Sequence, residues 1–197
     1  MPTVELVQEG APILCPMQGR SKGDHVSVLV HELCLELGHY KEDDGEVNQA
    51  RLELGNAWEY ALINRLQLDD PDRYIQPGEL ELDGVYGTPD ILDMVEKADC
   101  EIKCSFMSCK HGPGSDKFFK YETQLKAYLH MLATPKHRWL VGYLHVCFVM
   151  GDYKYGSPTS GPVYRIWRYV FTPQELEMNW KMLMNQAKRG AATRTRS

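Results

Sequence analysis

Two acidic residues and a lysine lie close together near the middle of the chain, as Asp90 and the tripeptide Glu101-Ile102-Lys103. On a β-strand alternate side chains share a face, so Glu101 and Lys103 point one way and Ile102 the other. A carboxylate and an ammonium at one strand end, with a second carboxylate nearby, can hold a divalent metal beside a reacting anion. The pattern therefore indicates phosphodiester chemistry.

That chemistry requires a deprotonated water, neutralised phosphate charge and a stabilised leaving oxygen, and one or two Mg²⁺ or Mn²⁺ ions can supply all three. These hard cations prefer oxygen ligands, mainly carboxylates. We therefore predict Asp90 and Glu101 as metal ligands, with the carbonyl of Ile102 as a further one. Lys103 then lies beside the metal, where its charge orients water and stabilises the transition state. Taken alone, however, Glu101 and Lys103 also fit a plain surface ion pair.

Asp93 competes with Asp90 for the role of carboxylate partner to Glu101. The two aspartates are three residues apart, so on one regular strand they face opposite ways. Asp90 follows Gly87 and Pro89, residues that mark a strand start or a bend near a site. We favour Asp90 and keep Asp93 as the alternative.

The elements that must position these residues follow from hydrophobic periodicity and turn residues. The expected order is α-α-β-β-β-α-β-β-α, which predicts an α/β fold with a central mixed β-sheet flanked by helices. A single domain over residues 1–197 suits this length. The predicted elements are an irregular arm over 1–24, helices over 28–37 and 47–67, strands over 79–86, 88–96 and 99–106, a helix over 117–133, strands over 138–150 and 163–171, a final helix, and a basic tail over 188–197.

Two helices carry explicit signals at their ends. Ser27 is the predicted N-cap of the first helix and Gly38 its stop. In the last helix Thr172 is the predicted N-cap, Pro173 takes the first helical position, and Glu175 completes a capping box.

Composition narrows the function classes. The net charge of −5 gives no global signal for nucleic acid, although a local basic groove is compatible with it. No apolar run approaches the roughly 20 residues of a membrane helix, and the N-terminus lacks a signal-peptide pattern. The six cysteines form no C-x-x-C pair, which disfavours zinc, and free thiols in the cytoplasm are expected. Cys100 and Cys104 fall on the strand face opposite Glu101 and are predicted to be core rather than ligands.

Asp90 followed by Glu101-x-Lys103 resembles the signature of the PD-(D/E)XK nuclease superfamily. Two further segments resemble its RecB-like and phage-type exonuclease branch. The stretch 54–60 is similar to the first motif of that branch, and the stretch 124–128 to its Gln-x-x-x-Tyr motif. In order and spacing the four motifs span about residues 47 to 130.

The resemblance implies a restriction-endonuclease-like core and a Mg²⁺- or Mn²⁺-dependent DNA nuclease. Glu59, Asp90 and Glu101 would ligate the metal, and Lys103 would assist the nucleophile. The iron–sulfur members of the branch carry a cysteine before the first motif and three near the C-terminus. Because no cysteine follows Cys147, we expect no iron–sulfur cluster.

Five residues are predicted to contact DNA. The resemblance implies that Gln124 and Tyr128, one helical turn apart, line the site and contact DNA or position Lys103. The three lysines that follow the third strand are candidates for contacts with the DNA backbone; they are Lys110, Lys117 and Lys120.

The resemblance favours an exonuclease in DNA recombination, repair or processing, in a bacterial cell or encoded by a phage. It leaves open a homo-oligomer or a recombination partner protein. Two alternatives remain: a catalytically inactive DNA-binding subunit of the same fold, and a metal-dependent hydrolase of another phosphate ester.

Other side chains fit structural roles. His31 and His130 lie on helices rich in apolar residues and are expected to be structural, whereas His111, in a Gly/Pro loop, is a weaker candidate for substrate contact. Trp167 and Tyr169 share a face of a late strand and are predicted to pack in the core.

Overall fold

The computed structural model describes residues 21–39, 49–134, 137–154, 157–158 and 161–194. Its central feature is a five-stranded sheet in the order β10-β7-β6-β5-β2. The central pair, β6 and β7, is parallel, and the other neighbours are antiparallel, so the sheet is mixed as predicted. Its strands are β2 (Tyr74–Ile75), β5 (Ile91–Asp93), β6 (Ala98–Ser105), β7 (Val141–Phe148) and β10 (Val163–Val170).

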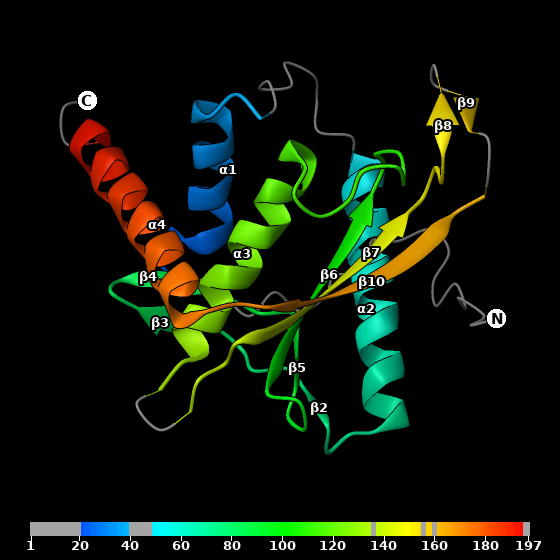
Figure 1. Cartoon of the computed structure of the whole chain (residues 1–197), viewed down its shortest axis with the longest axis horizontal. Helices are drawn as coiled ribbons and strands as arrows, with labels where there is room; N and C mark the ends of the chain where they lie inside the picture. The colour runs from blue at the N-terminus through cyan, green and yellow to red at the C-terminus, as the bar shows by residue number, and fades with distance from the viewer. Residues whose placement is uncertain (1–20, 40–48, 135–136, 155–156, 159–160, 195–197) are drawn as a thin grey trace.

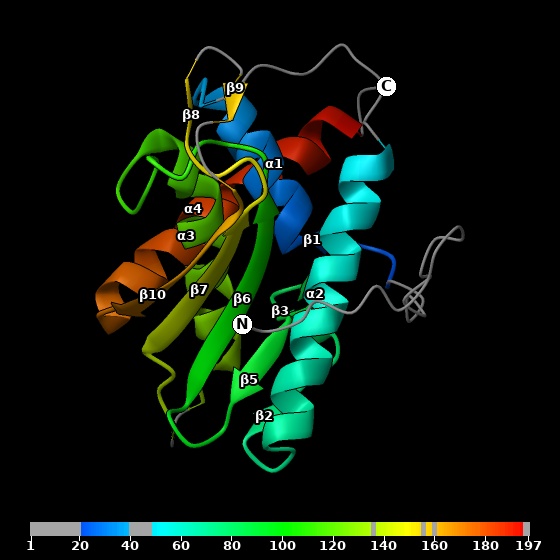
Figure 2. The same cartoon turned by 90° about the vertical axis from the view of Figure 1, so that its right-hand side faces the viewer.

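Helices cover both faces of this sheet (Figure 1). One face is covered by three helices that also contact one another: α1 (Val26–Glu36), α3 (Asp116–Leu132) and α4 (Pro173–Arg194). The single helix α2 (Gln49–Asp69) lies along the other face, as Figure 2 shows from the side. Because α3 connects β6 to β7, it forms the predicted parallel crossover. The α/β class, with a central mixed sheet flanked by helices, is confirmed.

Side chains alternate between the two faces of β6, and a separate hydrophobic core lies on each face of the sheet. Cys100 and Ile102 pack toward α2, together with Ile63 and Ile91. On the opposite face, the larger core lies between β7 and the helices α3 and α4. Its buried members include Phe118, Leu125, Leu129, Leu144, Val146, Phe148 and Leu176, with Trp167 and Tyr169 of β10 packed against it as predicted. The strand that carries Glu101 and Lys103 is therefore held from both sides.

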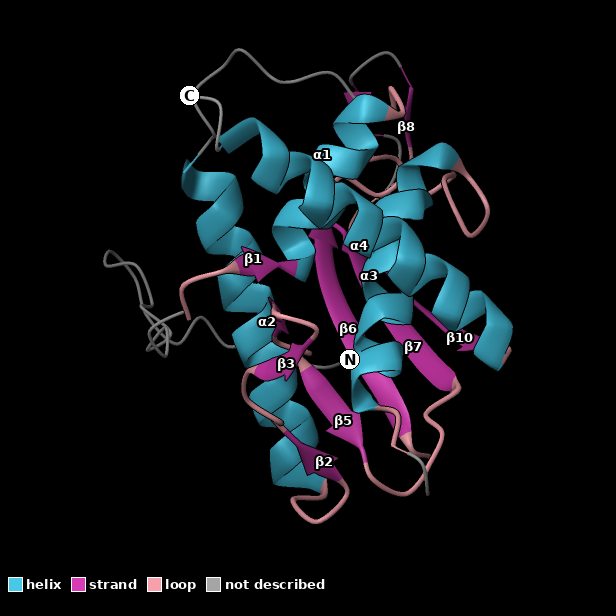
Figure 3. Cartoon of the chain, turned by 90° about the vertical axis from the view of Figure 1, so that its left-hand side faces the viewer, coloured by secondary structure: helices cyan, strands magenta, loops and turns pink. Residues whose placement is uncertain are grey.

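A small second sheet forms where one long strand was predicted. The stretch 79–86 is not continuous: β3 (Leu80–Leu82) and β4 (Val85–Gly87) pair as a hairpin, and β1 (Asp24–His25) adds to β4. Asp83 and Gly84 form the turn, with φ of 52° and 77°. Asp-Gly is a favoured two-residue hairpin turn because both positions need positive φ. This small sheet contacts α1 and α3 (Figure 3). The loop between β7 and β10 carries another short hairpin, β8 (Tyr153–Lys154) and β9 (Ser157–Pro158).

Of the two predicted ends of α1, the N-cap is wrong and the stop is confirmed. The helix begins one residue before Ser27, so the N-cap is His25, which makes no side-chain capping bond. The stop at Gly38 is confirmed, because its φ is 71°. The N–H groups of Gly38 and His39 donate to the carbonyls of Leu35 and Cys34, which is a Schellman motif.

The predicted termini differ from the structure where it describes them. The arm over residues 1–24 falls outside the described residues except for its last four, and Asp24 already belongs to β1. The basic tail predicted from residue 188 is helical, because α4 runs to Arg194. Arg189 donates to Glu36 of α1 at 2.6 Å, so this cation joins two helices. Residues 195–197 lie outside the described chain. No helix in the described ranges is long and apolar enough to cross a membrane.

The capping box of α4 is confirmed, and its energy can be measured. Thr172 N–H donates to Glu175 Oε2 at 2.7 Å, and Glu175 N–H donates to Thr172 Oγ1 at 3.2 Å. We expect Thr172→Ala to lower the free energy of unfolding by about 1 kcal/mol, as measured by urea denaturation. Ser27→Ala is the matched control, because Ser27 caps nothing, and its effect should stay within about 0.5 kcal/mol. Equal effects of the two substitutions would contradict this account.

Candidate active site

The candidate site lies at an open stretch of the β6 edge. The antiparallel neighbour β5 pairs with β6 only from Ala98 to Cys100, so the following residues of β6 have no strand on that side. Asp90, just before β5, takes the place of a strand: its Oδ2 accepts the N–H of Ile102 at 2.6 Å. The N–H and C=O of one strand residue point to the same side. The Ile102 carbonyl, a predicted ligand, is thus directed toward the same edge.

Asp90, Glu101 and Lys103 come together at this edge, as the sequence spacing predicted. The Lys103 ammonium contacts Glu101 Oε1 and lies 3.7 Å from Asp90 Oδ2. The Glu101 side chain is 0% exposed, Asp90 is 11% exposed and Lys103 is 18% exposed. Two buried carboxylates therefore share one ammonium, which is not the arrangement of a surface ion pair.

Asp93 is placed elsewhere and has a structural partner. Its Oδ2 accepts from Arg73 Nε at 2.9 Å and from Arg73 Nη2 at 2.6 Å. Its Oδ1 accepts the N–H groups of Val95 and Glu96, both at 3.0 Å. Burial alone would raise the pKa of Asp93, but the hydrogen bonds from Arg73 and from Glu96 lower it. Asp93 is thus an ionised anchor for the β5–β6 turn, and Asp90 is the carboxylate that faces Glu101.

Glu59 approaches the same edge from α2, on the other side of the sheet. Burial, followed by the charge of Asp90, raises the pKa of Glu59 to about 7, while Lys103 opposes this rise. Burial and the charge of Asp90 likewise raise the pKa of Glu101 to about 8. The charge of Asp90 destabilises the ionised forms of both Glu59 and Glu101, so the three acids share one electrostatic environment.

This donor set fits a divalent cation. One Glu101 oxygen, Oε2, is buried and has no hydrogen-bond partner. Burial would lower the pKa of Lys103, but the charges of Glu101 and Asp90 raise it well above its ordinary value. The protonated form of Lys103 is therefore favoured. A divalent ion would favour the ionised forms of Glu59 and Glu101. Three ionised carboxylates and one ammonium then leave two negative charges, which that ion would balance. Among the described residues, no group of three or more aspartate, glutamate, histidine or cysteine side chains is already arranged to hold a metal ion. Because Lys103 bridges Asp90 and Glu101, an entering ion would have to shift that ammonium.

Asp99 is a buried acid at this site that sequence reasoning missed. It lies on the same face of β6 as Glu101, is 0% exposed, and neither side-chain oxygen has a hydrogen-bond partner. Burial, then the charges of Glu101 and Asp90, raise its pKa well above the ordinary value, which favours its neutral form. The alternation from Glu101 would have placed Asp99 on this face, but a lone acid two residues away carried no signal for burial.

The Gln124 and Tyr128 pair packs against the acids from α3. Gln124 Nε2 donates to the Tyr128 hydroxyl at 2.9 Å, and both residues are buried. Burial, then the charge of Glu101, raise the pKa of Tyr128 well above its ordinary value, which places the phenol near the acids. A Cβ at Gly87 would lie 2.8 Å from Tyr128 Cε1. The glycine before Asp90 therefore lets α3 approach the site closely.

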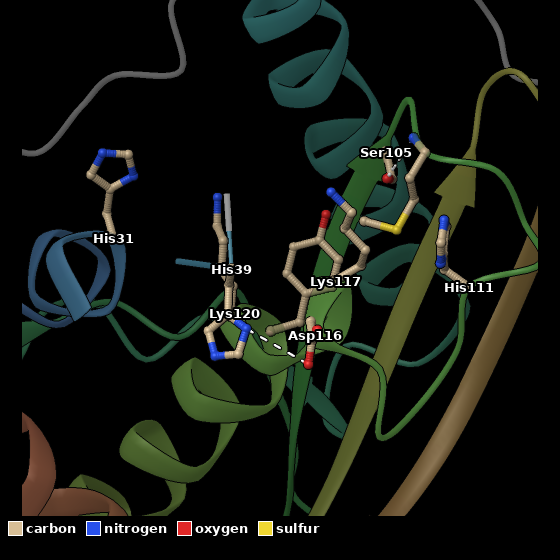
Figure 4. Close-up of a pocket in the computed structure, with 9 residues that line it drawn as sticks. His31, His39, Ser105, His111, Asp116, Lys117 and Lys120 are labelled. Carbon is tan, nitrogen blue, oxygen red and sulfur yellow. Dashed lines mark hydrogen bonds and ion pairs between the residues drawn. The ribbon is translucent and has the colours of Figure 1, made fainter. Parts of the chain in front are cut away.

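Two cavities lie near the site, and Lys103 lines one of them. One, of about 450 Å³, is lined by Ser27, Val28, His31, Lys103, Lys120 and Gln124. The other, of about 400 Å³, is lined by His31, His39, Ser105, Met107, His111, Asp116, Lys117, Lys120 and Tyr121 (Figure 4). Lys120 and His31 line both, so the two cavities adjoin. Burial and the nearby charge of Lys103 lower the pKa of Lys120. The lining is basic although the chain is acidic overall.

The lysines predicted to contact DNA differ in their position relative to the cavities. Lys117 and Lys120 line them, whereas Lys110 lies outside and pairs with Asp152 at 3.1 Å. His31 is exposed on α1 and lines both cavities, so it is not a core residue. His130 is structural as expected, stacked on Trp180.

Comparison with known proteins finds distant structural neighbours only. No known protein family and no curated protein matches the chain. A phage-related exonuclease from Haemophilus somnus 129PT is 16% identical, with a TM-score of 0.47, over 83% of this chain and 79% of that one. An alkaline exonuclease from Laribacter hongkongensis is 13% identical, with a TM-score of 0.47, over 88% and 92% of the two chains.

Proposed function

We propose that the protein is a metal-dependent deoxyribonuclease that hydrolyses phosphodiester bonds. The observation that carries the proposal is the site at the open edge of β6. There Asp90 and Glu101 share Lys103, Glu59 adds a third carboxylate, and basic cavities adjoin. A site that combines buried acids with cations suits both a metal and an anionic substrate.

Each residue has a distinct role in this proposal. Glu59, Asp90, Glu101 and the carbonyl of Ile102 hold Mg²⁺ or Mn²⁺. The bound metal would lower the pKa of an attacking water and neutralise phosphate charge. Lys103 remains protonated and orients that water, and its charge offsets the negative charge that develops on the phosphate.

The substrate would approach along the basic cavities. Lys117 and Lys120 offer cations to the DNA backbone, and their contribution should weaken with salt. Gln124 lines the cavity that contains Lys103, and its bond to Tyr128 fixes its orientation. An exonuclease in DNA recombination, repair or processing is the form of this activity that we favour.

The test is cleavage of end-labelled linear DNA and of a covalently closed circle, with Mg²⁺ or Mn²⁺. We expect Lys103→Ala to cleave about 10²-fold more slowly than the wild type, because a preorganised charge is lost. Lys103→Met, which keeps the buried stem, should behave alike, and circular dichroism checks the fold of both variants. Cleavage of the linear DNA alone would identify an exonuclease.

Two results would contradict the proposal: equal rates in wild type and both Lys103 variants, or no cleavage with any metal. DNA binding without cleavage, and without Mn²⁺ binding by isothermal titration calorimetry, would indicate an inactive DNA-binding subunit. Hydrolysis of a small phosphate ester but not of DNA would indicate a phosphatase.

A further inference from the structure

Cys104 and Cys147 face each other across the two central strands. They are register partners in the parallel pair β6–β7, on the sheet face that α2 covers. Neighbouring strands lie about 4.8 Å apart, which falls within the range of Cα separations that a disulfide spans. Both thiols are free, and Cys104 donates a hydrogen bond to Cys147.

The environment of this pair differs from that of other buried cysteines. Burial raises the pKa of the Cys34 and Cys100 thiols, which disfavours their reactive thiolate form. The hydrogen bond from Cys104 lowers the pKa of Cys147, although burial opposes this. Cys104 is only partly buried, so a small oxidant can reach the pair from its side.

We propose that Cys104 and Cys147 form a reversible disulfide that slows the nuclease when the protein is oxidised. With hydrogen peroxide as the oxidant, one thiolate attacks the peroxide and becomes a sulfenic acid, as the O–O bond breaks and one water leaves after protonation. The second thiol then displaces the sulfenic oxygen as another water. In sum, two thiols lose two electrons and two protons, and one peroxide becomes two waters. A dithiol reductant reverses the step.

The pair is connected to the active site through two elements. Cys104 directly follows Lys103 on β6. From α2, Gly55 packs onto Cys104: a Cβ at Gly55 would lie 3.9 Å from Cys104 Cβ. Glu59 lies one helical turn beyond Gly55, so movement at Cys104 reaches both Lys103 and Glu59.

Closing the disulfide requires such a movement. The Cβ atoms must approach from about 4.8 Å, the strand separation, to about 3.8 Å. A displacement of about 1 Å at a catalytic group can cost about 10²-fold in rate. We therefore expect oxidation to slow DNA cleavage by about 10- to 100-fold; this part of the inference rests on the proposed function.

The bond itself is tested without any activity assay. The full chain is treated with hydrogen peroxide, its remaining thiols are alkylated, and tryptic peptides are analysed by mass spectrometry. Because Cys104 and Cys109 share the tryptic peptide 104–110, the Cys109→Ala variant is the background in which the link is assigned. We expect a peptide pair joining 104–110 to 139–154, with a loss of two hydrogens, that dithiothreitol separates. Absence of this pair would overturn the inference, whether or not the protein is a nuclease.

The effect on activity is tested with Cys147→Ser, a residue outside the catalytic site. Peroxide should slow the Cys109→Ala protein, and dithiothreitol should restore its rate. The Cys109→Ala/Cys147→Ser protein should keep its rate in peroxide. Equal loss in both proteins, or a linked protein with an unchanged rate, would contradict a regulatory role for the pair.

Discussion

Asp90→Asn is expected to slow metal-dependent DNA cleavage by about 10³-fold, while the protein stays folded. Asparagine keeps the shape of aspartate and still offers an oxygen to the Ile102 N–H, so the strand edge is preserved. It removes one of the two negative charges that face Lys103, and with it a metal ligand. Single-turnover cleavage at saturating Mg²⁺ measures the rate, and thermal unfolding measures the stability.

Asp93→Asn is the matched control, and it should show the opposite pattern. Asp93 holds Arg73 and two backbone N–H groups and is remote from Lys103. Loss of its charge should lower the free energy of unfolding by about 2 kcal/mol, because hydrogen bonds to a charged group are weakened. The cleavage rate should remain near that of the wild type. If instead Asp93→Asn removed activity and Asp90→Asn did not, Asp93 would be the ligand and this assignment would be wrong.

Glu101→Gln is expected to reduce both metal binding and cleavage. Glu101 is completely buried, and its Oε2 has no partner in the protein, so this oxygen is available to a cation. The amide keeps the volume but removes the charge. We expect Mn²⁺ affinity to fall about 10-fold or more and the cleavage rate to fall about 10³-fold.

Isothermal titration calorimetry with Mn²⁺ and single-turnover cleavage check this result. Glu81→Gln is the control, because Glu81 makes the same acid-to-amide change at an exposed position on β3. It should alter neither quantity. Unchanged Mn²⁺ binding in Glu101→Gln would show that the metal is held elsewhere.

Much of the fold could be predicted because its signals are local. The capping box at Thr172 and Glu175 and the stop at Gly38 depend on bonds within one or two turns, so sequence alone locates them. The hairpin at Asp83 was missed because the apolar alternation runs through it, although Asp-Gly is itself a turn signal. The start of α1 was misplaced because Ser27 is a good N-cap by type, while the backbone of His25 takes that position.

The site could be predicted where the alternation of side chains along a strand determines which residues share a face. Alternation separated Asp90 from Asp93 and put Glu101 and Lys103 on one face. It could not show that β5 ends early, because that depends on pairing between strands, and the short β5 is what opens the edge to Asp90. It also could not find the cavity residues His31 and His39, since their positions depend on how α1 packs against α3.

Metal add-back is the most direct test of the central claim. Wild-type protein is treated with a chelator and freed of it, and end-labelled linear duplex DNA is added before Mg²⁺ or Mn²⁺. The structure predicts no cleavage before the ion is added and prompt cleavage afterwards, with little restored in Asp90→Asn or Glu101→Gln. Cleavage at the same rate in the chelator, or none with either ion, would contradict a metal-dependent nuclease at this site.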